Sequence, residues 1–225
     1  MRIHLDFTDF FDDSLDPPVR GHLHLPRTPS GDALVITHGA GSNARAPLLF
    51  GLAETFSAAG IAVLRCDLPF RQRHPHGPPR PGDSTQDREG LKNAVIAVQK
   101  LSPGRVFLGG HSYGGRQASM LSAVEPDLAG GLLLLCYPLH PPRKPTQMRT
   151  QHLPKLHTPT FFVHGTRDPF GSISELEEVI KLIPARTRLV KVEGAGHDLN
   201  FAKGTEDTRN HLAALILGAF QPFFS

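Results

Sequence analysis

Long apolar segments are missing from this sequence. No stretch approaches the roughly 18 consecutive apolar residues of a membrane span. Residues 1–16 contain five aspartates and no apolar run of signal-peptide length. These absences argue against a membrane-spanning or secreted protein. We therefore expect a cytoplasmic protein that has no membrane partner.

Cysteine is also scarce, because Cys66 and Cys136 are the only two in the chain. Each falls near the end of an apolar segment that predicts a buried strand. Free cysteine is often fully buried and packs like a small apolar side chain, and disulfides are rare in the cytoplasm. We expect two reduced thiols in the core, with a disulfide as the alternative.

Motifs for metal and nucleotide binding are absent too. None of the 13 histidines lies in an H-E-x-x-H or C-x-x-C context, and the pairs His22/His24 and His74/His76 have no further ligand nearby in the sequence. Residues 39–43 are rich in small residues like a phosphate loop, but the closing Lys-Ser/Thr of a Walker motif does not follow. We therefore expect no metal and no cofactor.

The chain does contain a regular alternation of short apolar runs and helical patterns, which is typical of βαβ units and a mostly parallel sheet. It has no internal repeat or low-complexity linker, and 225 residues suffice for one substantial core. We expect a single α/β domain over residues 1–225, with helices on both faces of the sheet. Strands are expected at residues 2–6, 19–25, 33–37, 61–66, 106–108, 131–137, 160–164 and 187–192, and helices at 48–59, 83–101, 113–124, 174–183 and 211–220.

The clearest chemical motif is G-x-S-x-G, formed by Gly110, Ser112 and Gly114 between a predicted strand and a predicted helix. A nucleophilic serine must sit on a very sharp turn so that its oxygen projects into the site. Side chains two residues before and after it would collide across that turn, which explains the glycines. The alternative is a glycine-rich turn in which Ser112 only caps the helix.

A nucleophile elbow of this type implies an acid and then a histidine further along the chain. Asp168 follows the predicted strand at residues 160–164, and His197 lies in a glycine-rich loop after the strand at 187–192. We predict that Asp168 orients His197 and that His197 takes the proton of Ser112. Asp198 is the alternative acid, and His111 and His164 are the alternative bases.

Two backbone amides are candidates for stabilising an oxyanion. The amide of Tyr113 begins the helix after Ser112, where the helix dipole also favours negative charge. The loop that follows the strand at residues 33–37 supplies the second donor in this arrangement, and it needs small residues for close approach. We predict Ala40 for this donor, with Gly39 as the alternative.

These motifs resemble those of the dienelactone-hydrolase-like α/β-hydrolases. The similarity is greatest to the group that includes a testis-expressed hydrolase-like protein and a hydrolase-like subunit of a chromatin acetyltransferase complex. It rests on residues 38–41, 65–70, 109–116 and 164–171. Relatives commonly have Arg before the nucleophile and Met after it, where this chain has His111 and Tyr113, as ordinary esterases do. The resemblance implies a three-layer α/β-hydrolase fold with a Ser-His-Asp triad. Because some relatives are interaction modules, it also raises a non-catalytic alternative.

Two proline-rich loops carry the positive charge of the chain. Only about two dozen residues separate the predicted strands at 131–137 and 160–164, so no lid domain fits and we expect an open site. Both loops follow strands and are expected at the carboxyl edge of the sheet, where ligands bind. The basic residues are Arg71, Arg73 and Arg80 in residues 67–82, and Arg143, Lys144, Arg149 and Lys155 in residues 138–158.

We predict that Arg71, Arg73, Arg143 and Lys144 form a basic rim that attracts anionic substrates, with a merely solubilising surface as the alternative. Apart from Phe70 the loops have no aromatic residues near these charges, which argues against a nucleic-acid partner. The expected activity is hydrolysis of small carboxylic esters or thioesters through an acyl-enzyme, with a preference for anionic substrates.

Overall fold

A mixed sheet forms the centre of the protein in the computed structural model, which describes the backbone of residues 7–200 and 206–225 and the side chains of 7–200 and 211–225. The strand predicted at residues 2–6 lies outside the described residues. The strands are β1 (Phe7–Asp12), β2 (Val19–His24), β3 (Ala33–Thr37), β4 (Ala62–Cys66), β5 (Val106–His111), β6 (Gly131–Leu135), β7 (Thr160–Gly165) and β8 (Thr187–Val192).

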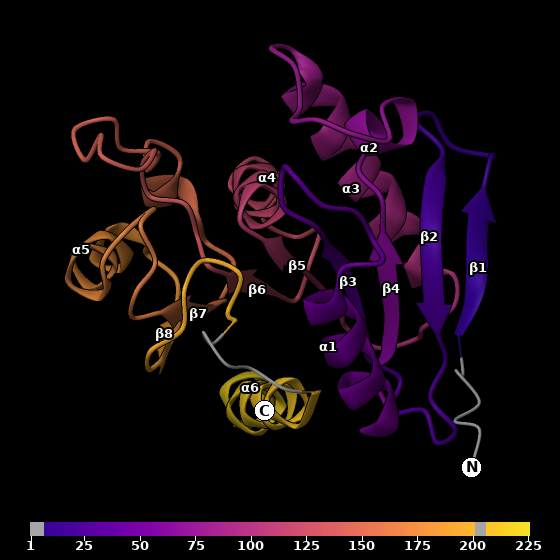
Figure 1. Ribbon diagram of the computed structural model, residues 1–225. Helices are drawn as coiled ribbons and strands as arrows, with labels where there is room; N and C mark the ends of the chain where they lie inside the picture. The colour runs from indigo at the N-terminus through magenta and orange to yellow at the C-terminus, as the bar shows by residue number, and fades with distance from the viewer. Residues whose placement is uncertain (1–6, 201–205) are drawn as a thin grey trace.

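The helices alternate with the parallel strands, as the sequence pattern predicts (Figure 1). The predicted helix boundaries agree to within a few residues, except that the last helix begins earlier and the one predicted at 174–183 ends as a 3₁₀ turn. The α-helices are α1 (Pro47–Ala58), α2 (Pro69–Arg73), α3 (Asp83–Gln99), α4 (Tyr113–Ser122), α5 (Ile173–Val179) and α6 (Glu206–Phe224), and the 3₁₀ turns are Leu153–Lys155 and Ile180–Leu182.

The sheet has the strand order β1-β2-β4-β3-β5-β6-β7-β8. β1 and β2 join its edge in antiparallel pairing, and the strands from β4 to β8 run parallel. The sequence analysis did not place a strand at Phe7–Asp12, because two aspartates and a threonine interrupt its apolar pattern. Pairing with β2 forms the strand: Phe7 faces His24, and their rings stack at 5.1 Å.

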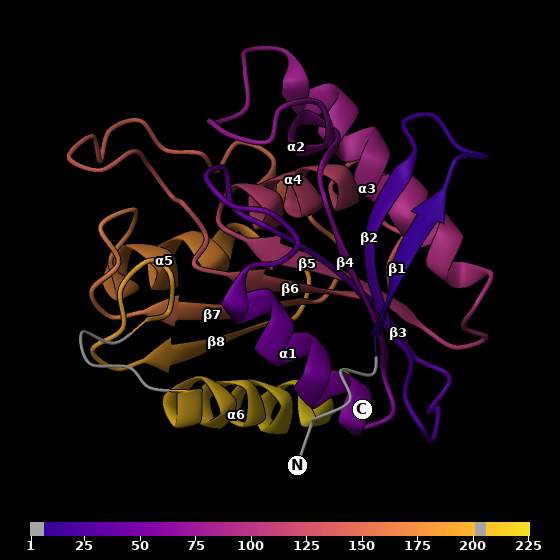
Figure 2. The same cartoon turned by 45° about the vertical axis from the view of Figure 1, so that its right-hand side comes forward.

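Two apolar clusters cover the two faces of the sheet. Strand residues alternate between them: Leu34 and Ile36 pack with α1 and α6, and Ala33 and Val35 pack with α3, α4 and α5. Figure 2 shows α1 and α6 together below the sheet and α3 and α4 above it. The protein therefore has the predicted three-layer architecture, with the sheet between two helical layers.

No lid covers the carboxyl edge of the sheet in the part of the chain that the structure describes. Residues 136–159, which connect β6 to β7, contain only the 3₁₀ turn Leu153–Lys155. Among the described helices, none combines the length and apolar character needed to cross a membrane. The prediction of a lid-less fold is confirmed.

Both cysteines are buried free thiols, as the sequence analysis expected. Cys66 ends β4 and Cys136 follows β6 directly. Burial is the main reason that the pKa of the Cys66 thiol is raised to about 12. These side chains are therefore protonated core residues at neutral pH.

Buried histidines predict a loss of stability in mild acid. Burial is the main reason that the pKa values of His24 and His38 are lowered to about 4 in the folded protein, whereas an unfolded imidazole has a pKa of about 6.5. Between these values the unfolded chain binds protons that the folded chain does not. The stability present above pH 6.5 is therefore lost as the pH falls toward 4.

Thermal melting between pH 7.5 and 4.5 measures this effect. We expect the melting temperature to fall across that range, and to fall less steeply in His24→Gln, which replaces the imidazole by a group that does not titrate. An equal slope in the variant would contradict the assignment of this loss to His24.

Candidate active site

The carboxyl ends of β5, β7 and β8 bring three predicted side chains together. Ser112 follows β5, Asp168 follows β7, and His197 follows β8. The hydroxyl of Ser112 lies 2.8 Å from Nε2 of His197, and Nδ1 of His197 lies 2.8 Å from Oδ2 of Asp168. A proton on Nδ1 is donated to Asp168, so Nε2 accepts the hydrogen of the serine hydroxyl. The three groups form one hydrogen-bonded chain.

The turn at Ser112 has the strained backbone that the motif predicts. Ser112 has φ 49° and ψ −114°, in the left-handed half of backbone space that favours glycine. A Cβ atom on Gly110 would lie 2.8 Å from the carbonyl carbon of Gly114, and one on Gly114 would lie 2.5 Å from the carbonyl oxygen of His38. A larger residue at position 110 would therefore force the turn apart, and one at position 114 would push α4 away from the end of β3.

Asp168 is fully enclosed, and both of its oxygens have partners. Oδ1 accepts the backbone N–H of Phe170 at 2.8 Å, while Oδ2 accepts from His197. Burial raises the pKa of Asp168, but the hydrogen bond and charge of His197 and the Phe170 amide outweigh it and bring the pKa below its usual value. The carboxylate is therefore ionised at neutral pH and fixes the tautomer of His197.

The alternative acid and bases are engaged elsewhere. Asp198 is largely exposed, and its Oδ1 lies 3.8 Å from Nε2 of His111. Nε2 of His111 also bonds to the carbonyl oxygen of His197 at 2.8 Å, and Nε2 of His164 bonds to that of Gly171 at 2.8 Å. Burial lowers the pKa of both His111 and His164. None of these three side chains replaces a member of the hydrogen-bonded chain.

An aromatic ring covers the imidazole of His197. The ring of Phe170 stacks on it with centroids 4.0 Å apart and planes inclined by 28°. The same residue donates its amide to Asp168, so one short segment after β7 holds both the acid and the histidine. Sequence reasoning missed this role, for which the only signal was the position of Phe170 two residues after the carboxylate.

The two predicted oxyanion donors lie beside Ser112. Tyr113 is the first residue of α4, where backbone N–H groups have no acceptor within the helix. A Cβ on Gly39 would lie 3.5 Å from that of Ser112, so the loop after β3 packs directly on the serine. The carbonyl oxygen of Gly39 accepts from Ser42 N–H at 3.1 Å and bonds to Nδ1 of His38 at 2.8 Å. In a trans peptide this directs the amide of Ala40 the opposite way.

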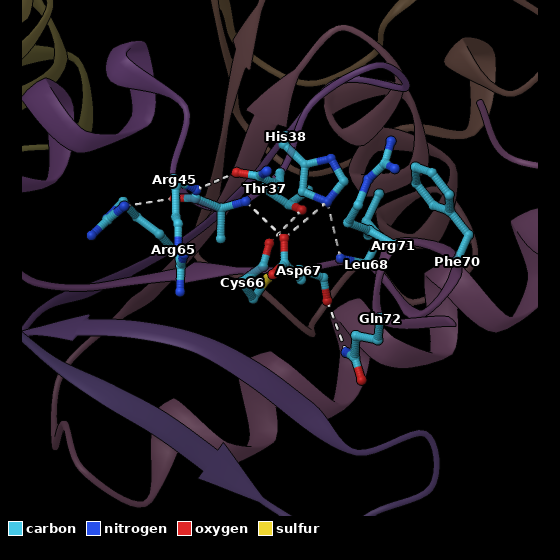
Figure 3. Close-up of polar contacts among 12 residues, drawn as sticks. Thr37, His38, Arg45, Arg65, Cys66, Asp67, Leu68, Phe70, Arg71 and Gln72 are labelled. Carbon is cyan, nitrogen blue, oxygen red and sulfur yellow. Dashed lines mark hydrogen bonds and ion pairs between the residues drawn. The ribbon is translucent and has the colours of Figure 1, made fainter. Parts of the chain in front are cut away.

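Side chains at the end of β4 hold this loop, as Figure 3 shows. Oδ1 of Asp67 accepts the amide of Ala44 at 2.7 Å, and Nη1 of Arg65 donates to the carbonyl oxygen of Ala44 at 2.6 Å. Nε2 of His38 accepts the amide of Leu68 at 3.2 Å, so the proton of this neutral imidazole sits on Nδ1. The sequence analysis listed these residues within similar motifs but did not foresee this support.

A buried carboxylate also anchors the start of α4. Asp87 of α3 accepts the hydroxyl of Tyr113 at 2.7 Å and the amide of Phe70 at 3.0 Å. Burial raises the pKa of Asp87, and these two hydrogen bonds oppose the shift. The side chain of Tyr113 is thereby tied to α3, which positions its backbone amide next to Ser112.

Arg71 does not belong to an open rim. It is buried, and its guanidinium donates to the carbonyl oxygens of Ala40 at 2.9 Å, His74 at 2.9 Å and Gly77 at 2.8 Å. It also does not line the cavity that contains Ser112. Arg71 therefore braces the backbone of two loops, and its predicted contact with substrate is corrected to a structural role.

The other predicted rim residues also lie away from the serine. Arg73 donates to Asp83 at 2.7 Å and to Gln86 at 2.6 Å. Arg143 and Lys144 are exposed, and neither lines the cavity around Ser112. The structure therefore does not bring these four basic residues together around the site.

A cavity of about 800 Å³ opens beside Ser112. Its walls include the beginning of α1, with Pro47, Leu48 and Leu49, and on the α4 side Arg116 and Arg149. The sequence analysis did not single out these two arginines as site residues. Arg149 belongs to the basic loop it described, and Arg116 ends the motif at residues 109–116.

Two groups of side chains have spacing that a metal ion could use. They are His111, Cys136 and His197, and Cys136, His164 and Asp168, with ligand atoms within 4.8 Å of one another. Burial raises the pKa of Cys136 well above its usual value, so the thiol keeps its proton. Metals bind the thiolate, and His197 and Asp168 already bond to each other. We assign no metal to either group.

Solved structures of hydrolases have the same fold. Est1E from Butyrivibrio proteoclasticus, which has also been solved with ferulic acid bound, superposes with a TM-score of 0.72 at 16% identity over 96% of this chain and 98% of its own. A dienelactone hydrolase from Anabaena variabilis gives 0.72 at 21% identity over the same shares. XC6422 from Xanthomonas campestris, described as a serine hydrolase without a lid, gives 0.69 at 12% identity over 99% of this chain and 97% of its own.

The sequence itself is related to other proteins at two levels. A segment of 55 residues is 42% identical to part of the polyketide synthase ThaQ from Burkholderia thailandensis, covering 24% of this chain but only 3% of that synthase. A family model described as an alpha/beta hydrolase domain matches residues 30–224, which is most of the chain. The protein therefore belongs to the alpha/beta hydrolase domain family.

Proposed function

We propose that this protein is a serine hydrolase that cleaves small carboxylic esters or thioesters through an acyl-enzyme on Ser112. The observation that carries the proposal is the hydrogen-bonded chain from Ser112 through His197 to the enclosed carboxylate of Asp168. A serine hydroxyl is a weak nucleophile unless an adjacent base removes its proton. The similarity to dienelactone hydrolases and esterases agrees with this chemistry.

The reaction proceeds in two halves. Nε2 of His197 takes the hydroxyl proton as Oγ of Ser112 attacks the ester carbonyl, and Asp168 stabilises the imidazolium that forms. The amides of Tyr113 and Ala40 donate to the oxyanion of the tetrahedral intermediate. His197 then gives its proton to the leaving alcohol or thiol as the bond to it breaks. In the second half, His197 takes a proton from water as the water oxygen attacks the acyl carbonyl. It returns that proton to Oγ of Ser112 as the bond between Oγ and the acyl carbon breaks and the acid leaves.

The cavity supports a small substrate. It lies at an edge without a lid, and its volume of about 800 Å³ falls within the range of small-molecule sites. Est1E, which has a similar fold, has been solved with a small acid, ferulic acid, bound. We propose short esters and thioesters as substrates, with a preference for anionic ones.

A fluorophosphonate probe tests the proposed activity directly, because it reacts with activated serines. We expect the probe to label the purified protein and mass spectrometry to place the adduct on Ser112, with hydrolysis of at least one member of a panel of short esters, thioesters and lactones. A folded protein that is neither labelled nor active on the panel would instead favour the interaction-module alternative.

A further inference from the structure

Two arginines face the cavity from different parts of the chain. Arg116 lies one helical turn after the nucleophile on α4, and its amide donates to the carbonyl oxygen of Ser112 at 2.9 Å. Arg149 comes from the connection between β6 and β7. Its backbone is fixed there, because its amide donates to Leu139 at 2.7 Å and its carbonyl accepts the hydroxyl of Tyr137 at 2.8 Å. Both cations are therefore held on rigid segments beside Ser112.

Neither guanidinium has a counter-ion among the residues that the structure describes. Nε of Arg116 is buried and has no hydrogen-bond partner. Within residues 7–200 and 211–225, no ion pair joins a carboxylate to Arg116 or to Arg149, although surface arginines such as Arg73 and Arg105 each pair with an aspartate. Burying a cation without a partner costs free energy, so an anion bound here would stabilise the two arginines.

The charges of the two arginines also act on each other and on their surroundings. Burial is the first cause that lowers the pKa of Arg149, and the charge of Arg116 is the second. Burial and the charges of Arg116 and Arg88 lower the pKa of the neighbouring His152 to about 4. Two like charges side by side in a half-buried wall repel each other, and an anion between them would relieve that repulsion.

The remaining lining of the cavity offers no competing charge at this wall. Asp198 is the one carboxylate among the described lining residues, and it lies against His111. Apolar side chains at the start of α1, Leu48 and Leu49, also line the cavity, and α1 packs on the other face of the sheet from α4. The cavity that contains Ser112 therefore has both cationic and apolar side chains in its lining.

We propose that Arg116 and Arg149 form a subsite for an oxyanionic group, a carboxylate or a phosphate, carried by the substrate a few bonds from the scissile carbonyl. Two guanidiniums can each donate paired hydrogen bonds to such a group. This inference rests on the proposed function and deepens it. It also moves the preference for anionic substrates from the four residues predicted as a rim to two residues inside the cavity.

A matched pair of chromogenic esters tests this subsite. The esters are 4-nitrophenyl hydrogen glutarate and 4-nitrophenyl pentanoate, which have acyl chains of similar length and differ in the terminal carboxylate. We expect the wild type to have the higher kcat/KM on the glutarate. We expect the ratio of the two kcat/KM values to fall about tenfold to a hundredfold in Arg116→Gln and in Arg149→Gln, the loss typical of a hydrogen bond to a charged group.

Control variants separate this subsite from general charge. Arg143→Gln removes an exposed charge from the same loop as Arg149, and it should leave the ratio as in the wild type. Arg116→Lys keeps the charge and should retain part of the preference. If Arg116→Gln does not fold, as judged by thermal melting, Arg149→Gln alone decides. Competition by glutarate and by glycerol 3-phosphate shows which oxyanion the wild type prefers.

The outcomes for the two proposals differ. Equal ratios in the wild type, Arg116→Gln and Arg149→Gln, with hydrolysis still dependent on Ser112, would overturn the subsite and leave the proposed function standing. If the wild type cleaves neither ester nor any member of the panel, the proposed function fails. Calorimetric titration of glutarate and glycerol 3-phosphate then decides: binding that is lost in Arg116→Gln supports the subsite, and no binding to the wild type refutes it.

Discussion

Replacing Ser112 with alanine is expected to lower kcat on any ester that the protein cleaves by about 10⁴–10⁶-fold. In the proposed mechanism the hydroxyl of Ser112 gives its proton to Nε2 of His197, so removing the hydroxyl leaves His197 without a nucleophile to activate. The amides of Ala40 and Tyr113, the proposed oxyanion donors, remain, and donors of this kind account for the residual rate that such variants keep. Initial rates on the best substrate of the panel, with active-site titration of the wild type, measure the loss.

The same variant should keep its fold. Ser112 makes its main-chain bonds through its amide, which donates to Leu135 at 2.8 Å, and through its carbonyl, which accepts from Arg116. Alanine preserves both hydrogen bonds, and the strained φ of 49° costs alanine and serine a similar free energy. Thermal melting close to that of the wild type is therefore the control. Retained wild-type activity in a properly folded variant would show that another residue is the nucleophile.

Features that depend on residues close together in the chain were predictable from the sequence. The buried strands are short apolar runs, and α3 has apolar positions at helical spacing, with Leu91, Ala94, Val95 and Val98 all buried. The elbow was recognisable because glycine is required on both sides of the serine by the backbone itself, as the close approach of Gly110 and Gly114 shows. Local backbone geometry of this kind requires particular residues at particular positions, so it can be recognised in the sequence.

Side-chain partners from distant segments were not predictable in this way. Arg71 looked like a member of a charged surface loop, but it bonds to the carbonyl oxygen of Ala40, 31 residues earlier in the chain. Nothing in the composition of the loop distinguishes it from Arg143, which is exposed. The edge strand Phe7–Asp12 was missed for a similar reason, since its pairing with β2 and not its own pattern makes it a strand.

The positive charge of the loops was only a partial guide to the residues that line the site. The sequence indicated that the connection between β6 and β7 is basic, and Arg149 of that connection does line the cavity. The count could not identify which cation enters the site, because that depends on the bonds of Arg149 to Leu139 and Tyr137. Arg116 was missed because it lies outside the two basic loops, in α4, where the sequence pattern indicates only which side chains pack in the core.

Changing Asp168 to asparagine is expected to lower kcat by about 10⁴-fold. The amide group would donate a hydrogen bond to Nδ1 of His197, so the imidazole would carry its proton on Nε2 and could not accept the proton of Ser112. Asp198→Asn is the matched control, since this neighbouring carboxylate is 72% exposed and contacts His111 rather than His197. Its loss should be much smaller. Rates of both variants on one substrate decide the assignment, and a greater loss in Asp198→Asn would mean that Asp168 is not the acid.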